Sequence, residues 1–363
     1  AADKAQLYWA ISEGGSWSGA PSSPIFVGED LVFTTKSEIV KIDRVTGKTI
    51  KKNTMISRSA FSLVPPTYAD GMIFVALGGG RVQAFNAETL DSLWVYQDPL
   101  GGQPDSPILY HDGYVYTGFW NSEKDEANYV AILAEDEKPA EQSERKEAAW
   151  THTHKGGFYW AGAIAAGGAI VVGSENGEEK ESISTGVLYA FHPTSGKILD
   201  KISDIDGDIR SSIVLDKTTG TYHFVSRGGS FYSIKVNGDG TFDKDSLKKI
   251  SLSGAATSTP AIHNGRAYIG VAGSNSLGAY SGHSITVIDL TSQEIAYQVP
   301  TRGYPQASGL LSTGYLAEDG YTYVYFIENY SPGIMRVIKD KPGQTQAVLT
   351  EVNNGILGER EAD

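Results

Sequence analysis

Short segments along this chain carry aromatic and charged side chains of the kind that bind ligands. Each segment lies a few residues before an apolar, strand-forming stretch, and the arrangement recurs along the chain. The candidate binding residues are Trp17, Arg58, Gln103, Asp105, Tyr159, Trp160, Asp208, Arg210, Tyr304 and Gln306. Aromatic faces supply contact area, while arginine, aspartate and glutamine fix orientation. This combination suits a neutral polar ligand such as a sugar or a peptide.

The same residues admit two other interpretations. Rings at the junctions of sheets commonly pack, and arginine–aspartate pairs commonly brace a scaffold, so a structural role is the more frequent one for any single residue. Alternatively, Asp105 and Asp208 could be the acid and base of a lyase or hydrolase, with Arg58 or Arg210 stabilising developing charge. Carboxylates facing each other across an open pocket would favour this enzyme, whereas carboxylates held in salt bridges would disfavour it.

A second set of loops is longer than the other bends. The loops at residues 119–128, 272–284 and 328–333 contain Trp120, Tyr280 and Tyr330, respectively. Enlarged loops on one face of a repeat protein point to binding, although solvated decoration explains them equally well. These three aromatic residues complete the candidate set.

The elements that must position these side chains are clearest in residues 65–95. The turn Ala69-Asp70-Gly71 precedes the apolar run Met72–Leu77, and Gly78–Gly80 makes the next bend. Arg81–Asn86 alternates between apolar and polar residues, and a further turn leads to Ser92–Val95. These signals predict four short antiparallel strands. One such sheet is marginally stable alone, so repetition is expected.

The same order of strands and turns recurs seven times. In other copies, for example, Tyr114–Gly118 and Ala169–Gly173 are the expected second strands, and a polar insertion, Ala134–Lys146, precedes the last strand of the third copy. The predicted repeats span approximately residues 20–53, 62–97, 104–154, 158–203, 208–252, 256–299 and 307–352. Seven four-stranded units favour radial packing into one all-β domain over residues 1–363, a β-propeller of antiparallel blades. In a propeller the candidate loops converge on one axial face.

Closure of the propeller has two solutions. Leu7-Tyr8-Trp9 is similar to the end of a fourth strand, so residues 1–12 are a candidate ring-closing strand. Residues 346–352, however, offer the last repeat a fourth strand of its own. Either one terminal strand is spare or an eighth blade is incomplete. We expect seven blades and keep eight as the alternative.

The repeated pattern resembles a known family. Its signals are turns such as Asp70-Gly71, strands such as Tyr114–Gly118, bends such as Thr46-Gly47-Lys48, and a tryptophan such as Trp94. Together they resemble the PQQ-like repeat of quinoprotein alcohol dehydrogenases and of the outer-membrane assembly lipoprotein propeller. The resemblance implies a propeller over nearly the whole chain and an extracytoplasmic location, secreted or at the cell surface. It implies little about activity, because most copies of the repeat contact no cofactor.

The quinoprotein enzymes differ from this chain where they bind their cofactor. The chain has no cysteine, so the adjacent-cysteine disulfide of those enzymes cannot form, and their calcium ligands are not found. We therefore expect no pyrroloquinoline quinone and no other cofactor. His152 and His154 alternate on a predicted strand and could share a metal with a third ligand, but a polar strand face explains them better. No metal site is predicted.

Composition also limits the kinds of partner that the chain can bind. The net charge of −13 argues against nucleic acid, which requires clustered lysine and arginine. No apolar run approaches the roughly 18 residues of a membrane-spanning helix. The start Ala1-Ala2-Asp3 indicates a trimmed end, so secretion is inferred from the resemblance and composition alone. We expect a non-catalytic bacterial binding protein for a glycan, peptide or protein, with the enzyme as the alternative and the oligomeric state undetermined.

Overall fold

The computed structural model describes residues 8–13, 20–58, 64–121, 124–175, 185–273, 282–330 and 333–350. Within these residues the only helix is the single turn α1 (Leu316–Asp319), and the other regular elements are β-strands. The strands form seven sheets, and each contains the four strands of its repeat. The pairings resolved between these neighbouring strands are antiparallel. The predicted all-β architecture of four-stranded antiparallel units is confirmed.

The chain divides into two compact units. The N-terminal unit comprises Leu7–Glu178 with Tyr189–Leu199, and the C-terminal unit comprises Ala1–Gln6, Glu179–Leu188 and Asp200–Asp363. Strands β16 (Thr185–Phe191) and β17 (Ile198–Asp206) cross the division.

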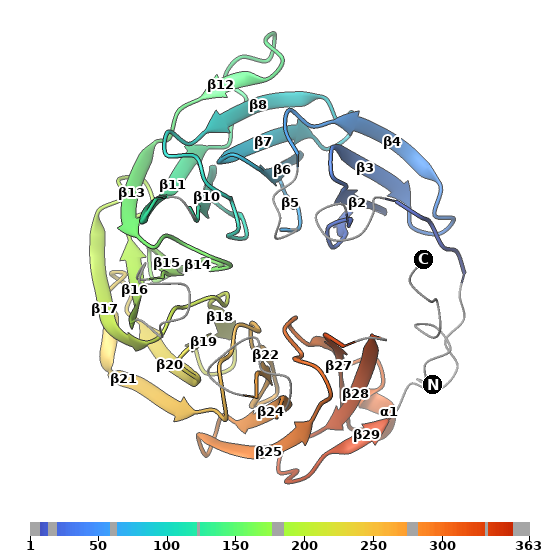
Figure 1. The fold of residues 1–363 in the computed structure, drawn as a ribbon, viewed down its shortest axis with the longest axis vertical. Helices are drawn as coiled ribbons and strands as arrows, with labels where there is room; N and C mark the ends of the chain where they lie inside the picture. The colour runs from blue at the N-terminus through green and yellow to red at the C-terminus, as the bar shows by residue number, and fades with distance from the viewer. Residues whose placement is uncertain are drawn as a thin grey trace. The chain divides into compact units, whose positions relative to one another are not determined.

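The N-terminal unit contains three whole sheets and the first strands of a fourth (Figure 1). The first sheet consists of β1 (Ile25–Val27), β2 (Asp30–Thr34), β3 (Glu38–Asp43) and β4 (Thr49–Thr54). The second consists of β5 (Thr67–Ala69), β6 (Met72–Leu77), β7 (Arg81–Asn86), β8 (Ser92–Gln97) and the added strand β12 (Glu144–Lys146). The third consists of β9 (Leu109–His111), β10 (Tyr114–Gly118), β11 (Glu126–Leu133) and β13 (Trp150–Lys155). The fourth begins with β14 (Ile164–Ala166) and β15 (Ala169–Gly173).

The C-terminal unit contains the last three sheets. The fifth sheet consists of β18 (Val214–Asp216), β19 (Thr221–Ser226), β20 (Ser230–Val236) and β21 (Phe242–Ser251). The sixth consists of β22 (Ala261–His263), β23 (Arg266–Val271), β24 (Ser284–Asp289) and β25 (Glu294–Pro300). The seventh consists of β26 (Leu310–Ser312), β27 (Thr322–Glu328), β28 (Ile334–Asp340) and β29 (Val348–Thr350).

Strand β12 is a departure from the predicted pattern. It lies in the polar insertion and pairs in parallel with β8 (Figure 1). This pairing places Glu144 opposite Trp94. Lys146 is buried and forms ion pairs with Glu137 and Glu144. The Glu-Arg-Lys sequence of this strand lacks the apolar alternation by which strands are recognised, so it was missed.

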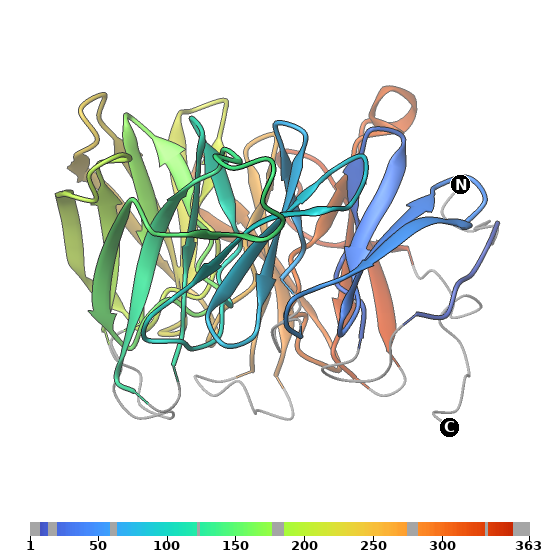
Figure 2. The same cartoon turned by 90° about the horizontal axis from the view of Figure 1, so that it is seen from above.

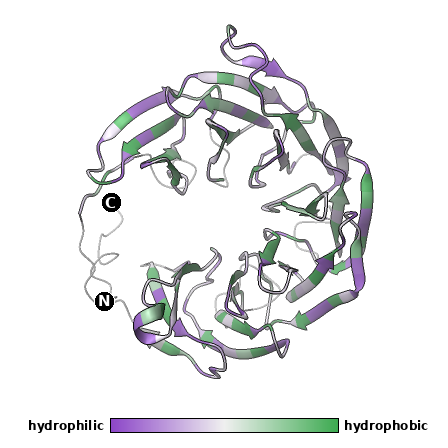
Figure 3. Cartoon of the chain, turned by 180° about the vertical axis from the view of Figure 1, so that it is seen from behind, coloured by the Kyte–Doolittle hydropathy of each residue, from purple (hydrophilic) through white to green (hydrophobic). Residues whose placement is uncertain are grey.

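The cores of both units lie between successive sheets. The buried cluster between the second and third sheets contains Phe74, Trp94, Val115 and Phe119. Apolar and polar residues alternate along many strands (Figure 3), and the strands of each sheet are twisted (Figure 2). Because a single sheet cannot cover its own apolar faces, each sheet is stabilised by its neighbours.

Two tryptophans fasten one sheet to the next in the N-terminal unit. Trp94 in β8 is fully buried, and its Nε1 donates to the carbonyl oxygen of Ala134 at 2.9 Å. Trp150 in β13 donates to the carbonyl oxygen of Pro193 at 2.6 Å. Its ring covers Gly196, which has a φ of 67° and where a Cβ would lie 2.6 Å from the ring. Glycine in this bend therefore makes room for the tryptophan.

Trp9 docks on the first sheet in the same manner. Its Nε1 donates to the carbonyl oxygen of Arg44 at 2.9 Å, and a Cβ at Gly47 would lie 2.7 Å from its ring. Relative to the first sheet, Trp9 thus takes the place of a fourth-strand tryptophan. Residues 8–13 form no strand, however, and the seventh sheet has its own fourth strand, β29. Ring closure by residues 1–12 and the number of blades stay predictions.

Candidate functional site

Three of the predicted aromatic residues come together in the N-terminal unit. Trp120 follows β10, and Tyr159 and Trp160 follow β13. The ring centroids of Trp120 and Tyr159 lie 5.0 Å apart at an edge-on angle of 65°, and those of Tyr159 and Trp160 lie 4.5 Å apart. All three side chains are partly exposed. We call these three residues the aromatic cluster.

Backbone pairing holds the loops of the aromatic cluster in place. The amide of Gln103 donates to the carbonyl oxygen of Trp120 at 2.7 Å, and the Trp120 amide donates back to Gln103 at 2.8 Å. The Phe158 amide donates to the carbonyl oxygen of Phe119 at 2.9 Å. A loop of the entering set and a loop of the second set therefore meet, as propeller topology predicts.

A buried carboxylate anchors the segment that leads to Gln103. Asp98 accepts hydrogen bonds from Asn128 Nδ2 at 2.9 Å, from the Tyr96 hydroxyl at 3.0 Å and from the Leu100 amide at 2.9 Å. Burial and the charge of Asp98 raise the pKa of Tyr96, so its hydroxyl stays protonated and remains a donor. These hydrogen bonds hold the start of the segment that leads to Gln103.

Trp160 itself has an unusual backbone conformation. Its φ is 58°, in the left-handed region that bulky residues rarely adopt. Such a residue costs about 1–3 kcal/mol of strain and is tolerated where the surrounding structure fixes it, often at functional sites. The strain places an indole at a partly exposed position where glycine would fit with less cost.

The other candidates of the N-terminal unit lie outside the aromatic cluster. Arg58 is exposed, and its carbonyl oxygen accepts a hydrogen bond from the Gly78 amide at 2.8 Å. Asp105 is only 1% exposed and precedes Ser106, whose hydroxyl donates to the carbonyl oxygen of Phe158 at 2.7 Å. Asp105 is therefore a buried residue beneath the loops and does not present its carboxylate on the surface.

In the C-terminal unit, Asp208 is held in ion pairs. Its Oδ2 lies 3.0 Å from Arg227 Nη1 and 3.7 Å from Arg210 Nη2, and Asp208 is 5% exposed. The pairing of Asp208 with Arg210 joins two predicted residues, whereas Arg227, directly after β19, was missed. The carboxylate of Asp208 is thus held in salt bridges, which is the arrangement that disfavours the enzyme alternative.

Tyr304 packs inside the C-terminal unit. It is buried, its hydroxyl accepts a hydrogen bond from the Thr257 amide at 2.9 Å, and burial raises its pKa. Its carbonyl oxygen accepts the amides of Asn329 at 3.0 Å and Gln306 at 2.9 Å. Tyr304 therefore offers no exposed ring as a binding platform, whereas the neighbouring Tyr330 is 48% exposed.

Two of the predicted binding residues cannot be placed in the structure. Trp17 and Tyr280 lie outside the described residues.

The predicted histidine pair does not form a metal site with other side chains of the described residues. His154 contacts the Tyr189 hydroxyl through Nδ1 at 2.9 Å and the Ser174 hydroxyl through Nε2 at 3.1 Å. Among the residues that the structure describes, no three histidine, aspartate or glutamate side chains are grouped to hold a metal ion. Nor does any helix in that part of the chain have the length and apolar character to span a membrane.

Comparison with known proteins agrees with the repeat pattern. Residues 1–124 match the family described as outer membrane protein assembly factor BamB. The crystal structure of BamB from Moraxella catarrhalis is similar over 95% of this chain and 91% of its own length, with a TM-score of 0.60 and 10% identity. The chain has the fold of the PQQ-like repeat β-propellers. The resemblance seen in the sequence is confirmed. No curated protein matches the chain significantly in sequence.

Enzymes share this fold. Quinohemoprotein alcohol dehydrogenase from Comamonas testosteroni is 14% identical, with a TM-score of 0.64, over 91% of this chain and 66% of its own. A europium-containing methanol dehydrogenase is 12% identical, with a TM-score of 0.53, over 89% of this chain and 84% of its own. The chain thus spans about two thirds of the quinohemoprotein enzyme.

Two carboxylates singled out in the sequence, Asp105 and Asp208, are not arranged as ligands of a metal-assisted quinone site. Such a site needs carboxylate or amide oxygens free to bind a cation. Asp208 instead forms ion pairs with Arg227 and Arg210, and Asp105 is buried. We derive no chemistry through such a cofactor.

Proposed function

We propose that the chain is a non-catalytic, extracytoplasmic propeller that binds an extended segment of a protein partner through the aromatic cluster. The observation that carries this proposal is the contact of Trp120, Tyr159 and Trp160, three partly exposed rings on loops held by backbone pairing. Rigid aromatic side chains are enriched in protein interfaces because they bury much area at low entropic cost. No nucleic-acid partner is expected for so acidic a chain.

A protein ligand is favoured over a glycan by the family match. The matching family is an assembly factor for outer membrane proteins, and the match includes Gln103 and Trp120. An extended peptide can lie across adjacent rings while its backbone pairs with exposed loop groups. The enzyme alternative gains no support from the carboxylates, because Asp208 is salt-bridged and Asp105 is buried.

Replacing Trp160 with glycine is the sharpest test of this proposal. Glycine adopts a φ of 58° without strain, so the free energy of unfolding should change by less than about 1 kcal/mol. Peptides selected from a random library on the wild-type chain should bind this variant at least tenfold more weakly. Stability is measured by urea denaturation, and affinity by calorimetry.

The controls separate binding from folding and peptides from sugars. Tyr8→Ala removes an aromatic ring that is 83% exposed and lies outside the aromatic cluster, so peptide affinity should not change. A glycan array is probed with the same proteins. If Trp160→Gly loses several kcal/mol of stability, Trp160 is a packing residue and the proposal fails. Glycan binding lost in this variant, with no peptide selected, would reassign the ligand class.

A further inference from the structure

A polar cavity of about 330 Å³ lies in the C-terminal unit, where the fifth sheet faces the turn between β24 and β25. Its walls include His223, Ser233, Lys235, Lys248, Leu290 and Gln293. This volume is at the lower end of the range of small-molecule sites, about 300–1,000 Å³. Elsewhere the fifth and sixth sheets meet through an apolar core, so the polar cavity interrupts an otherwise packed interface.

The register of the sheets explains why this space exists. Phe74, Tyr116 and His223 each stand three residues after the glycine of their first hairpin turn. In each sheet, this residue of the second strand is paired with one residue of the third strand, which is paired with one of the fourth. These paired residues are Phe74–Ala84–Trp94 in the second sheet, Tyr116–Ala131–Trp150 in the third and His223–Ser233–Lys248 in the fifth. Lys248 therefore stands where the other two sheets place the docking tryptophan.

The turn between β24 and β25, which faces this row, also differs from the turn that lies beneath Trp150. Gln293 has a φ of 59° and occupies the place that Gly196 occupies beneath Trp150. Its Nε2 donates to the carbonyl oxygen of Leu290 at 2.6 Å, which corresponds to the Pro193 oxygen that accepts the Trp150 indole. The glutamine amide thus replaces the hydrogen bond of the absent tryptophan but fills only part of its space.

The base of the cavity carries an imidazole with an unmet hydrogen bond. His223 is 1% exposed, its Nδ1 lies 2.9 Å from the Ser233 hydroxyl, and its ring stacks on Phe231. Its Nε2 is buried and has no hydrogen-bond partner among the described residues. Burial lowers the pKa of His223 to about 4, so the ring is neutral at pH 7. A buried polar atom without a partner is costly unless another molecule satisfies it.

The cavity also has a positive side. Lys235 and Lys248 are exposed, and neither forms an ion pair within the part of the chain that the structure describes. The carboxylate among the lining residues, Asp216, accepts hydrogen bonds from the Thr218 amide at 2.9 Å and the Thr219 hydroxyl at 2.8 Å inside its own turn. The two ammonium groups are thus available to an anion.

We propose that this cavity binds a small planar aromatic carboxylate, independently of the aromatic cluster. The ring takes the space of the absent tryptophan, with a polar ring atom facing His223 Nε2, and the carboxylate pairs with Lys235 and Lys248. A cavity of about 150 Å³ can hold benzene, so the larger volume here accommodates a bicyclic ring with a charged substituent.

Indole-3-acetate is the probe that tests this assignment, measured with the whole chain by calorimetry and ligand-observed NMR. We expect saturable 1:1 binding, and weaker binding of uncharged indole. Lys248→Gln should weaken indole-3-acetate at least tenfold while leaving the affinity for indole unchanged, because only the charge pairing is lost. The control Lys217→Gln removes a lysine of the turn between β18 and β19 that does not line the cavity, and it should have no effect.

The double variant Lys248→Trp with Gln293→Gly tests the space itself. It introduces the same tryptophan–glycine combination as Trp150 over Gly196, so the new indole should fill the cavity, abolish probe binding and raise the Tm. Binding that survives in a folded double variant would place the ligand elsewhere. Absence of saturable binding to the wild type, or an equal loss for indole and indole-3-acetate in Lys248→Gln, would also overturn the proposal.

Discussion

Replacing Trp94 with alanine is expected to lower the free energy of unfolding by about 3–5 kcal/mol. The indole is fully buried between the second and third sheets, its centroid lies 5.8 Å from that of Phe74, and its Nε1 donates to Ala134. The truncation leaves a cavity and removes the hydrogen-bond donor for a buried carbonyl oxygen. The cavity stays open, because the two sheets cannot move closer together without breaking hydrogen bonds between their strands. Urea denaturation followed by circular dichroism measures the loss.

Trp9→Ala provides the matched comparison. Trp9 makes the same type of contact, with Nε1 on the Arg44 carbonyl oxygen, but its ring is partly exposed and therefore buries less area. Its removal should cost roughly 1–2 kcal/mol, because the transfer term scales with buried apolar area. A loss below about 1 kcal/mol for Trp94→Ala would mean that the indole does not fasten the two sheets.

The strands were predictable because each has a local signature. Met72–Leu77, Arg81–Asn86, Tyr114–Gly118 and Ala169–Gly173 agree with β6, β7, β10 and β15 residue for residue. Their apolar runs are bounded by glycine turns, which mark strand ends directly. Strand β12 has no such signature, because it is defined by pairing with β8, a partner far away in sequence.

The candidate site was predictable only in part. Propeller topology brought the loops of Gln103 and Trp120 together, because it depends on the repeat and not on individual contacts. The partners of buried charges were not predictable in this way. Arg227, which pairs with Asp208, follows a strand like any other turn residue, and only the folded chain shows which carboxylate it meets.

The turn glycines hold a signal that sequence reasoning left unused. Gly196 lies under a docking tryptophan, whereas the equivalent Gln293 faces Lys248 and the cavity. A non-glycine residue at this left-handed position therefore indicates that the preceding repeat lacks its tryptophan. Leu90, with a φ of 56°, follows the same rule, because the first sheet has Lys51 in its fourth strand where the second and third sheets have tryptophan.

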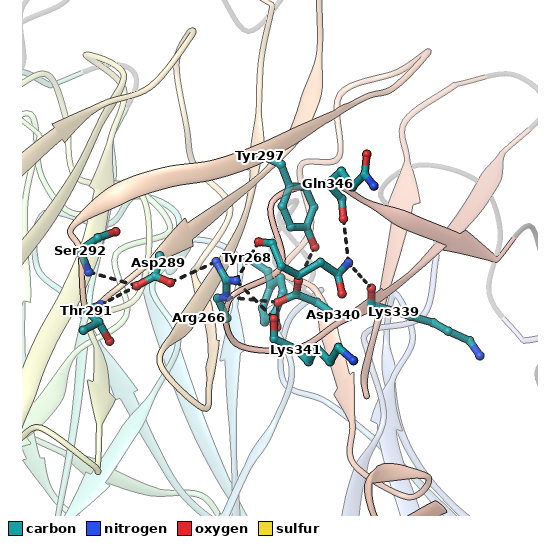
Figure 4. Close-up of polar contacts among 11 residues, drawn as sticks. Arg266, Tyr268, Asp289, Thr291, Ser292, Tyr297, Lys339, Asp340, Lys341 and Gln346 are labelled. Atoms are coloured by element: carbon teal, nitrogen blue, oxygen red, sulfur yellow. Dashed lines mark hydrogen bonds and ion pairs between the residues drawn. The ribbon is translucent and has the colours of Figure 1, made fainter. Parts of the chain in front are cut away.

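A buried charge network ties the sixth sheet to the seventh in the C-terminal unit (Figure 4). Arg266 in β23 is 1% exposed, with Nε 3.6 Å from Asp340 Oδ2 and Nη1 3.4 Å from Asp289 Oδ2. The hydroxyls of Tyr268 and Tyr297 donate to Asp340 at 2.8 and 2.6 Å. Burial and the Asp340 carboxylate raise the pKa of both tyrosines, so they remain donors at neutral pH.

Replacing Arg266 with methionine should therefore cost about 3–5 kcal/mol, because it leaves the buried carboxylate of Asp340 without its cation. Adding Asp340→Asn should recover part of this loss, since the uncompensated charge disappears, whereas Asp340→Asn alone should destabilise the wild type. The exposed pair Arg145–Glu147 supplies the control, and Arg145→Met should cost less than about 0.5 kcal/mol.

Comparing tryptophan fluorescence with circular dichroism also shows which of the two units Arg266→Met destabilises. All six tryptophans lie between residues 9 and 160, so tryptophan fluorescence reports on the N-terminal unit, whereas circular dichroism reports on all sheets. If the two units unfold together, both midpoints fall together; if they unfold separately, only the dichroism transition shifts. A loss below about 1 kcal/mol by either probe would show that Asp340 does not depend on Arg266, and additive effects of the two substitutions would show that they are not coupled.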